Sequence, residues 1–246
     1  IFKNSQKAGV MSSDHLVILS SSTKVFMSHN IPYPFRQNTD FLYFSGFKEP
    51  DSAIVLHTRP DKELPDFVSA VFIPKSDSHV ERWEGPKTDI DGAIDLLGVD
   101  SAHYIDDLQT FLHSYATQSK EFSLWYDYTA ENFSPVKEIV RDFLADHGKI
   151  RCTSPRLLIQ QLRLIKSSSE AALMRKTCRT ASEAMLEVMK FSRAPVLESH
   201  LHAKMEYECR VRGADYLAFP PVVAGGSRAN SIHYLSNDQQ VKHGEI

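Results

Sequence analysis

The residues best suited to chemistry lie near the end of the chain, where a histidine follows paired prolines and paired glycines: Pro220–Pro221, Gly225–Gly226 and His233. Prolines restrict the backbone, whereas glycines let it take positive φ angles and approach a ligand closely. An imidazole held at a pocket wall can pass a proton or donate a hydrogen bond near neutral pH. Composition alone favours another interpretation, in which a glycine hairpin carries a structural histidine.

A second group of candidates comprises His200 and His202 with two nearby carboxylates, Glu198 and Glu206. Histidines two residues apart point to different faces of a helix, whereas zinc-binding helices place them four apart. Glu198 and Glu206 each lie four residues from His202, but such carboxylate–imidazole pairs are common on solvated helix faces. We therefore expect no metal site here. Motifs of the type HExxH, GxSxG, P-loop or CxxC are also absent from the sequence.

The composition excludes several classes of function. The 246 residues carry 28 Lys and Arg against 31 Asp and Glu, a formal charge of −3, so no global field attracts nucleic acid or anionic lipid. No stretch approaches the roughly 18 apolar residues needed to span a bilayer. We expect no nucleic-acid and no membrane partner. The three cysteines, Cys152, Cys178 and Cys209, suit a reducing compartment better than a disulfide framework.

The elements that must position these residues differ between the two halves of the chain. In the first half, short apolar runs separated by Gly and Pro predict strands covered on both faces, at residues 16–19, 41–44, 53–56 and 70–73. Helical spacing of apolar residues occurs at 106–115 and 136–147. Residues 14–150 are therefore expected to form one compact α/β domain.

The second half reads as long helices. Ser167 and Glu170 can form a capping box, which predicts a helix over residues 167–189 with an apolar seam at Met174, Cys178, Ala181, Met185 and Val188. A further helix is predicted over residues 197–212, closed by Gly213 in the left-handed conformation. Residues 216–219 then read as a strand that Pro220–Pro221 stops.

Several of these segments carry a family resemblance. The stretch Phe-Pro-Pro-Val-Val-Ala-Gly-Gly at residues 219–226, continued to His233 and Tyr234, resembles the aminopeptidase P (Xaa-Pro aminopeptidase) family. That family's catalytic domain has the pita-bread fold shared with creatinase and methionine aminopeptidase. Other segments are similar to its mitochondrial members, namely residues 31–43, 46–52, 83–86, 91–93, 161–167 and 212–215. The resemblance implies an α/β protein, with a creatinase/aminopeptidase P-like N-terminal domain at residues 14–150 and an incomplete pita-bread (α+β) domain at residues 157–246.

The resemblance also implies roles for two residues. His233 would line the substrate pocket near a binuclear manganese site and donate to a substrate or intermediate oxygen. Trp83 would reach an active site, which in some relatives belongs to a neighbouring subunit. A flat indole can pack against a proline ring. The alternative for Trp83 is an aromatic side chain anchored in its own domain.

One departure from the family pattern concerns the metal ligands. The family binds two Mn²⁺ ions through two Asp, one His and two Glu that follow the His-Tyr pair, and the element Lys-x-Gly-Glu, here residues 242–245, leads into the strand with the first of them. None of the five can be assigned here, so we expect no stable Mn²⁺ binding. The chain starts at Ile1 without Met and stops at Ile246, and we expect both ends to lie within a longer protein.

The implied activity is release of an N-terminal residue that precedes proline, with peptides carrying proline at the second position as substrates. The resemblance further implies a homodimer in the mitochondrion, with the cytoplasm as the alternative, and an inactive chain as long as the metal ligands are missing. Two other interpretations stay open. One is a non-catalytic truncated form that acts as an interaction or dimerisation module; the other is a pita-bread protein that lost catalysis and binds partners.

A partial catalytic domain carries a consequence for stability. Its two predicted helices would leave an apolar face uncovered, formed by Met174, Met185, Leu201 and Met205. Exposed apolar faces favour aggregation or chaperone binding.

Overall fold

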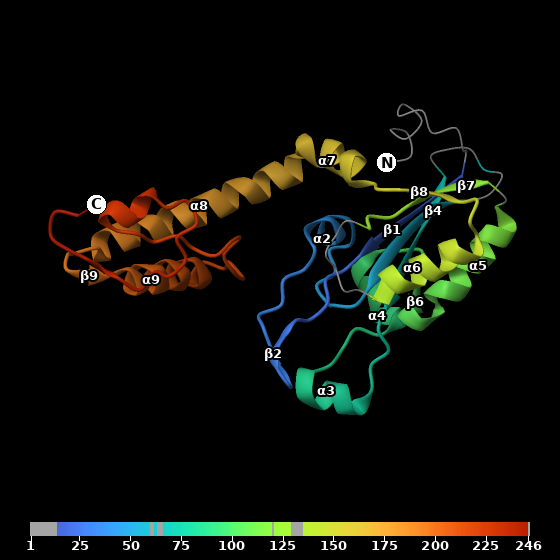
Figure 1. The fold of residues 1–246 in the computed structure, drawn as a ribbon, viewed down its shortest axis with the longest axis horizontal. Coiled ribbons are helices and arrows are strands. Elements are labelled where there is room, and N and C mark those ends of the chain that lie inside the picture. The colour runs from blue at the N-terminus through green and yellow to red at the C-terminus, as the bar shows by residue number, and fades with distance from the viewer. Residues whose placement is uncertain (1–13, 60–61, 63–65, 120, 129–134, 246) are drawn as a thin grey trace. The chain divides into compact units, whose positions relative to one another are not determined.

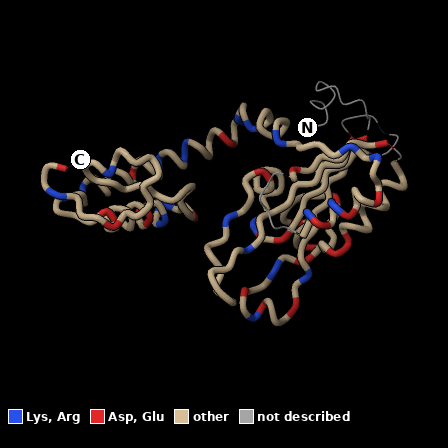
Figure 2. Tube along the Cα trace, viewed as in Figure 1, with Lys and Arg blue, Asp and Glu red and all other residues tan. Residues whose placement is uncertain are grey.

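The computed structural model describes residues 14–59, 62, 66–119, 121–128 and 135–245. The expectation about the chain ends concerns Ile1 and Ile246, and both residues lie outside this range. The chain divides into two compact units, residues 1–164 and 165–246, each described by itself (Figure 1). The domain limits expected from the sequence, residues 14–150 and 157–246, stay a prediction. Lys and Arg are interspersed with Asp and Glu along both units (Figure 2).

The described part of the first unit is built on a six-stranded mixed sheet with the order β6-β5-β4-β1-β7-β8. The strands are β1 (Asp14–Ser20), β4 (Ala53–Thr58), β5 (Phe67–Ile73), β6 (Ser101–Tyr104), β7 (Phe122–Trp125) and β8 (Arg151–Thr153). Only β4 runs against its neighbours, since β1 pairs in parallel with β7 and β5 with β6. At the centre of the sheet, Val17 faces Leu56 on β4 and Trp125 on β7.

Helices cover both faces of this sheet, as the continuous apolar strand sequences predicted. Successive residues of a strand point to opposite faces, so Leu16 and Ile18 join one buried cluster and Val17 and Leu19 the other. The first cluster is closed by α5 (Leu108–Gln118), which follows the 3-10 turn η1 (Ile105–Asp107), and by α6 (Pro135–Asp146). The second is closed by α2 (Thr39–Ser45), α4 (Ile90–Leu97) and α7 (Arg156–Leu164).

The strand predicted at residues 41–44 is wrong, because these residues lie in α2. The Asn38 side chain accepts hydrogen bonds from the amides of Asp40 and Phe41, each at 3.0 Å. Gly46 closes the helix with φ 70°, a conformation that glycine adopts without steric cost. Only Phe41 of this helix is fully buried. The two caps therefore decide the conformation of an apolar run whose composition suits a strand equally well.

The hairpin of β2 (Phe26–Ser28) and β3 (Ile31–Pro32) and the helix α3 (Ser78–Glu84) complete the first unit. α3 begins at Asp77, whose carboxylate accepts from the amides of His79 and Val80. None of the described helices combines the length and the hydropathy needed to cross a membrane.

The second unit contains α8 (Ser168–Phe191), α9 (Glu198–Val211), the 3-10 turn η2 (Gly226–Asn230) and a small sheet in which β9 (Val196–Leu197) pairs antiparallel with β10 (Gln240–Val241). The predicted capping box is confirmed: the Glu170 amide donates to Ser167 Oγ and the Ser167 amide to the Glu170 carboxylate. Gly213 has φ 88° after α9, as predicted.

One expectation for this unit was wrong. Residues 216–219 form bends, not a strand, and Pro220 and Pro221 next to them have no amide to donate to a ladder. The expected uncovered apolar face is confirmed at Met174 and Met185, which are about half exposed, and within α8 the buried residue is Ala184. Leu201 and Met205 are partly buried.

Candidate functional site

The segment with the paired prolines, paired glycines and His233 runs from the end of α9 to β10. The local geometry requires glycine at both position 225 and position 226. A Cβ on Gly225 would approach Val241 Cγ2 of β10 to 2.7 Å, and Gly226 has φ 60° with the Glu245 side chain 3.2 Å from the same position. Only a residue without Cβ fits these two positions, so the segment passes closely over β10 before η2 begins.

A buried carboxylate at the start of α9 holds this segment. Glu198 has no exposed surface. Its Oε1 accepts from the Gly225 amide at 2.9 Å and from Arg228 Nε at 2.8 Å. Its Oε2 accepts from the Tyr234 hydroxyl at 2.8 Å and from the Gln239 amide at 3.1 Å. Glu198 is therefore not part of a solvated carboxylate–imidazole pair with His202, as the sequence suggested, but the common acceptor for four donors of the loop.

These contacts keep Glu198 ionised. Burial by itself raises the pKa of a carboxyl group, but the hydrogen bonds from Gly225, Arg228, Tyr234 and Gln239 outweigh it and lower the pKa of Glu198 to about 2. The ion pair with Glu198 also raises the pKa of Arg228. A buried charge with every acceptor position occupied is stable in place, whereas loss of one partner is costly.

Asn237 anchors the proline end of the same segment. Its side chain is buried, with Oδ1 accepting from the Val223 amide at 2.8 Å and Nδ2 donating to the Pro221 carbonyl at 2.9 Å. Asn237 has φ 48°, a left-handed conformation that asparagine tolerates better than most residues. The sequence placed Glu198 on a solvated helix face and did not single out Asn237, because their partners are 14 to 41 residues away along the chain.

His233 is exposed, at the third position of a turn in which the Tyr234 amide donates to the Ser231 carbonyl at 3.3 Å. The next residue, Tyr234, is tied to Glu198 through its hydroxyl. The imidazole therefore does not belong to the core of the unit. An exposed imidazole on an anchored turn can donate a hydrogen bond or transfer a proton to a bound molecule.

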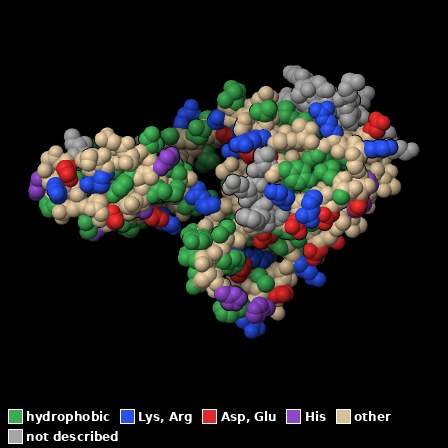
Figure 3. All heavy atoms as spheres, viewed as in Figure 1, with side chains coloured by type: hydrophobic (Ala, Val, Ile, Leu, Met, Phe, Trp, Pro, Cys, Tyr) green, Lys and Arg blue, Asp and Glu red, His purple; other side chains and the backbone are tan. Residues whose placement is uncertain are grey.

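Trp83, the other residue singled out in the sequence, lies on α3 in the first unit. Trp83 is 77% exposed, and its ring centroid lies 6.4 Å from that of His79 on the same helix. A hollow beside it is lined by apolar and charged groups, among them Phe26, Pro32, His79 and Val80. Hydrophobic side chains gather on the face that carries this hairpin and α3 (Figure 3). Trp83 and His233 belong to different units.

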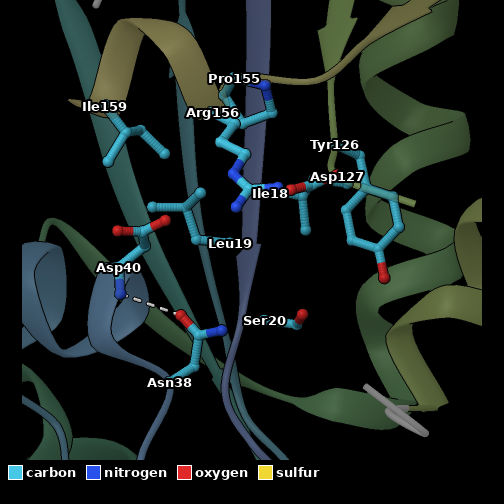
Figure 4. A pocket seen from close by; sticks show the side chains of 10 residues that line it. All are labelled: Ile18, Leu19, Ser20, Asn38, Asp40, Tyr126, Asp127, Pro155, Arg156 and Ile159. Atoms are coloured by element: carbon cyan, nitrogen blue, oxygen red, sulfur yellow. Dashed lines mark hydrogen bonds between the residues drawn. The ribbon is translucent and has the colours of Figure 1, made fainter. Parts of the chain in front are cut away.

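A smaller pocket lies where β1 and β7 end, with Arg156 extending into it and Asp40 and Asp127 on its walls (Figure 4). Its other lining residues are Ile18, Leu19, Ser20, Asn38, Tyr126, Pro155 and Ile159. The carboxyl ends of parallel strands are common ligand sites, but this pocket contains none of the residues singled out in the sequence.

The described residues contain no group of three or more His, Cys, Asp or Glu side chains that could hold a metal ion. In the described part of the chain, His202 pairs with Glu206, with 3.9 Å between His202 Nε2 and Glu206 Oε2. A structural or catalytic metal needs at least three protein ligands in the common arrangements. The described residues therefore do not fit a binuclear metal site.

Two protein-family models match separate parts of the chain. Residues 3–125 match the aminopeptidase P N-terminal domain, and residues 172–246 match metallopeptidase family M24. The chain is 41% identical to Xaa-Pro aminopeptidase 3 of Mus musculus over 97% of its own length and 47% of that protein. It is 34% identical to mitochondrial intermediate cleaving peptidase 55 of Arabidopsis thaliana, over 96% of this chain and 46% of that one.

The fold agrees as well. The low-pH form of aminopeptidase P from Escherichia coli superposes with a TM-score of 0.85 at 25% identity, covering 99% of this chain and 56% of that chain. The chain thus spans about half the length of the curated relatives it matches. An N-terminal domain of the aminopeptidase P type followed by part of an M24 domain confirms the expected fold class, and the chain belongs to the aminopeptidase P family.

Proposed function

We propose that this chain is part of an Xaa-Pro aminopeptidase, which releases the N-terminal residue that precedes proline from peptides. The observation that carries the proposal is the exposed His233 on a turn anchored to the buried Glu198, within the segment that matches family M24. A relative named Xaa-Pro aminopeptidase 3 supports this substrate class.

In this proposal His233 donates a hydrogen bond or a proton to an oxygen of the substrate. Trp83 is proposed separately to pack against a proline ring at an active site, which in some relatives belongs to a neighbouring subunit. The exposure of both side chains supports such contacts. The neutral imidazole donates a hydrogen bond through its N–H group, and the protonated ring can transfer a proton. A flat indole offers a large apolar face to a proline ring.

The metal belongs to the complete enzyme. We propose two Mn²⁺ ions there, held by carboxylate and imidazole ligands that hard manganese prefers, in a part of the M24 domain that this chain does not include. When bound, such ions supply an activated water and a Lewis acid. No residue of this chain is assigned to them, so the 246-residue chain by itself is proposed to be inactive.

The proposed location is the mitochondrion, with the cytoplasm as the alternative. The support is the similarity to intermediate cleaving peptidase 55, mitochondrial, of Arabidopsis thaliana. Imaging of a tagged full-length protein against a mitochondrial marker tests this location.

Activity assays test the function. The 246-residue chain and a longer form that completes the M24 domain are incubated with Mn²⁺ and either an Xaa-Pro-Xaa peptide or the matched Xaa-Ala-Xaa peptide. We expect turnover of the proline peptide by the longer form alone, and a loss of about 10²-fold or more in His233→Ala, the scale of general acid–base catalysis. His200→Ala, an exposed histidine of α9, is the control. Comparable turnover by the 246-residue chain contradicts the proposal.

A second candidate function is an interaction or dimerisation module. The observation in its favour is the exposed apolar surface of the first unit, formed by Val25, Phe26, Met27, Ile31, Tyr33 and Trp83. Large exposed apolar patches mark interaction sites. Sedimentation of the chain and of Phe26→Ser over a range of concentrations tests a homodimer; a monomer at all concentrations in both excludes it.

A further inference from the structure

Two residues on either side of His233 donate to the same carboxylate. Arg228, five residues before it, donates through Nε to Glu198 Oε1 at 2.8 Å, and Tyr234, the next residue, donates through its hydroxyl to Oε2 at 2.8 Å. The turn between them is closed by the Ser231 amide, which donates to the Arg228 carbonyl at 3.0 Å. The chain on both sides of His233 is therefore hydrogen-bonded to the same buried carboxylate.

Glu198 is not needed merely to close the ends of this segment. β9 and β10 already pair residues 196–197 with 240–241, and the Glu198 amide donates to the Gln239 carbonyl at 2.9 Å. The Glu198 side chain instead reaches the interior of the segment, at Gly225, Arg228 and Tyr234. Four donors bind the two carboxylate oxygens from different directions. These hydrogen bonds hold the carboxylate and its donor groups in one arrangement relative to each other.

We propose that Glu198 is a positioning residue, which holds the turn so that the His233 imidazole faces the substrate in one orientation. The proposal rests on the function proposed above for His233. Side chains that act on a substrate must be held close to their working geometry by neighbours whose own positions are locked by hydrogen bonds. Glu198 has no exposed surface itself, so it acts through Arg228 and Tyr234 and not by touching the substrate.

The first test uses the 246-residue chain and needs no activity. Glu198→Gln replaces one carboxylate oxygen with an NH2 group, which donates and does not accept. Tyr234→Phe removes one hydroxyl while the aromatic ring stays. Glu206→Gln is the matched control, because Glu206 lies on the same helix in an exposed pair with Arg210. Hydrogen exchange of the Gly225 and Gln239 amides and the NMR signals of the His233 ring are followed.

In Glu198→Gln we expect exchange to accelerate about tenfold or more at the amide, Gly225 or Gln239, that faces the new NH2 group, as for loss of a hydrogen bond to a charged group. In Tyr234→Phe these two amides stay protected, whereas the His233 ring signals shift or broaden. The control resembles the wild type in both measurements. Unchanged His233 signals in both Glu198→Gln and Tyr234→Phe overturn the proposal.

The second test separates this inference from the proposed function. In a longer form that completes the M24 domain, Tyr234→Phe is expected to lower kcat about tenfold with little change in KM, because the substrate contacts remain while the imidazole loses its orientation. If His233→Ala leaves kcat unchanged, the function proposed for His233 fails, and the NMR result still decides whether Glu198 orients the ring. If His233→Ala lowers kcat and Tyr234→Phe and Glu198→Gln do not, the positioning role is wrong.

Discussion

Glu198 and Arg228 form an ion pair at 2.8 Å in which the carboxylate is completely buried and the guanidinium side chain is 27% exposed. The two residues are 30 positions apart, so the pair joins the start of α9 to η2. The Arg228 guanidinium also donates to the Gln240 carbonyl at 3.2 Å. One side chain thereby connects the helix, the turn before His233 and the small sheet.

Arg228→Met should destabilise the second unit by about 3–5 kcal/mol, because it leaves a buried carboxylate without its cation. Arg210→Met is the control, since its pair with Glu206 is exposed and such pairs contribute about 0–1 kcal/mol. The sequence has no tryptophan after Trp125, so the amide NMR signals of α9 in a urea titration report this unit. Equal urea midpoints for the two variants would show that the buried ion pair stabilises the unit no more than the exposed one.

Acid should unfold the second unit through Glu198. The pKa of this carboxyl is about 2 in the folded protein against an ordinary value of 4.5, so the unfolded state binds the proton more tightly. The stabilisation is complete above pH 4.5 and is lost as the pH falls toward 2. Glu198→Gln is less stable at neutral pH but should lose less on acidification. We expect the two stability curves, measured by hydrogen exchange in α9, to converge at low pH; parallel curves contradict this.

His15 should make the first unit sensitive to mild acid. The residue is buried, and its Nδ1 accepts a hydrogen bond from Trp125 Nε1 at 3.2 Å, which requires the neutral ring because indole is only a donor. Burial lowers the pKa of His15 below 6.5, against a smaller opposing effect of Asp14. The unfolded state therefore takes up the proton first, and stability falls as the pH drops below 6.5.

Trp125 fluorescence in a urea titration at several pH values measures this loss. His15→Gln keeps an acceptor but removes the titration, so its stability should depend less on pH in that range. His57 contributes to the remaining dependence, because burial lowers its pKa as well. An unchanged pH profile in His15→Gln would assign the effect to His57 alone.

Asn38→Ala should destabilise the first unit by about 1 kcal/mol, the usual cost of losing an N-cap. The side chain caps two amides of α2. Asn38→Ser retains a capping oxygen and serves as the control. Urea unfolding followed by Trp125 fluorescence should place the serine variant near the wild type, and a serine variant as unstable as the alanine one would exclude capping as the cause.

Limited proteolysis should cut the second unit before the first. α8 exposes Leu173, Met174, Met185, Leu186, Met189 and Phe191, and its buried residue is Ala184. A helix with so little buried surface opens at low free-energy cost. Mass spectrometry of early fragments should recover residues of the first unit intact. If the region after Arg151 resists cleavage equally well, the uncovered apolar face does not weaken this unit.

Local signals in the sequence were sufficient for several features. Ser167 and Glu170 lie three residues apart and form the predicted capping box, and Gly213 ends α9 with a positive φ. The runs at 16–19, 53–56 and 70–73 are strands because their continuous apolar sequence suits burial on both faces. The motif around His233 also identified the family, because its prolines, glycines and histidine lie close together along the chain.

Tertiary structure decided the rest. Residues 41–44 have a composition that suits a strand or a helix, and only the packed structure shows Phe41 of α2 buried in the second cluster. Glu198 looked like one more surface carboxylate on a helix, because its donors Gly225, Arg228 and Gln239 are 27 to 41 residues away. Hydrogen bonds between neighbours along the chain are set by spacing, whereas the burial of a charge depends on which distant segments fold over it. The sequence by itself therefore determined the family and the local elements, and only the folded chain revealed which carboxylate holds the turn of His233.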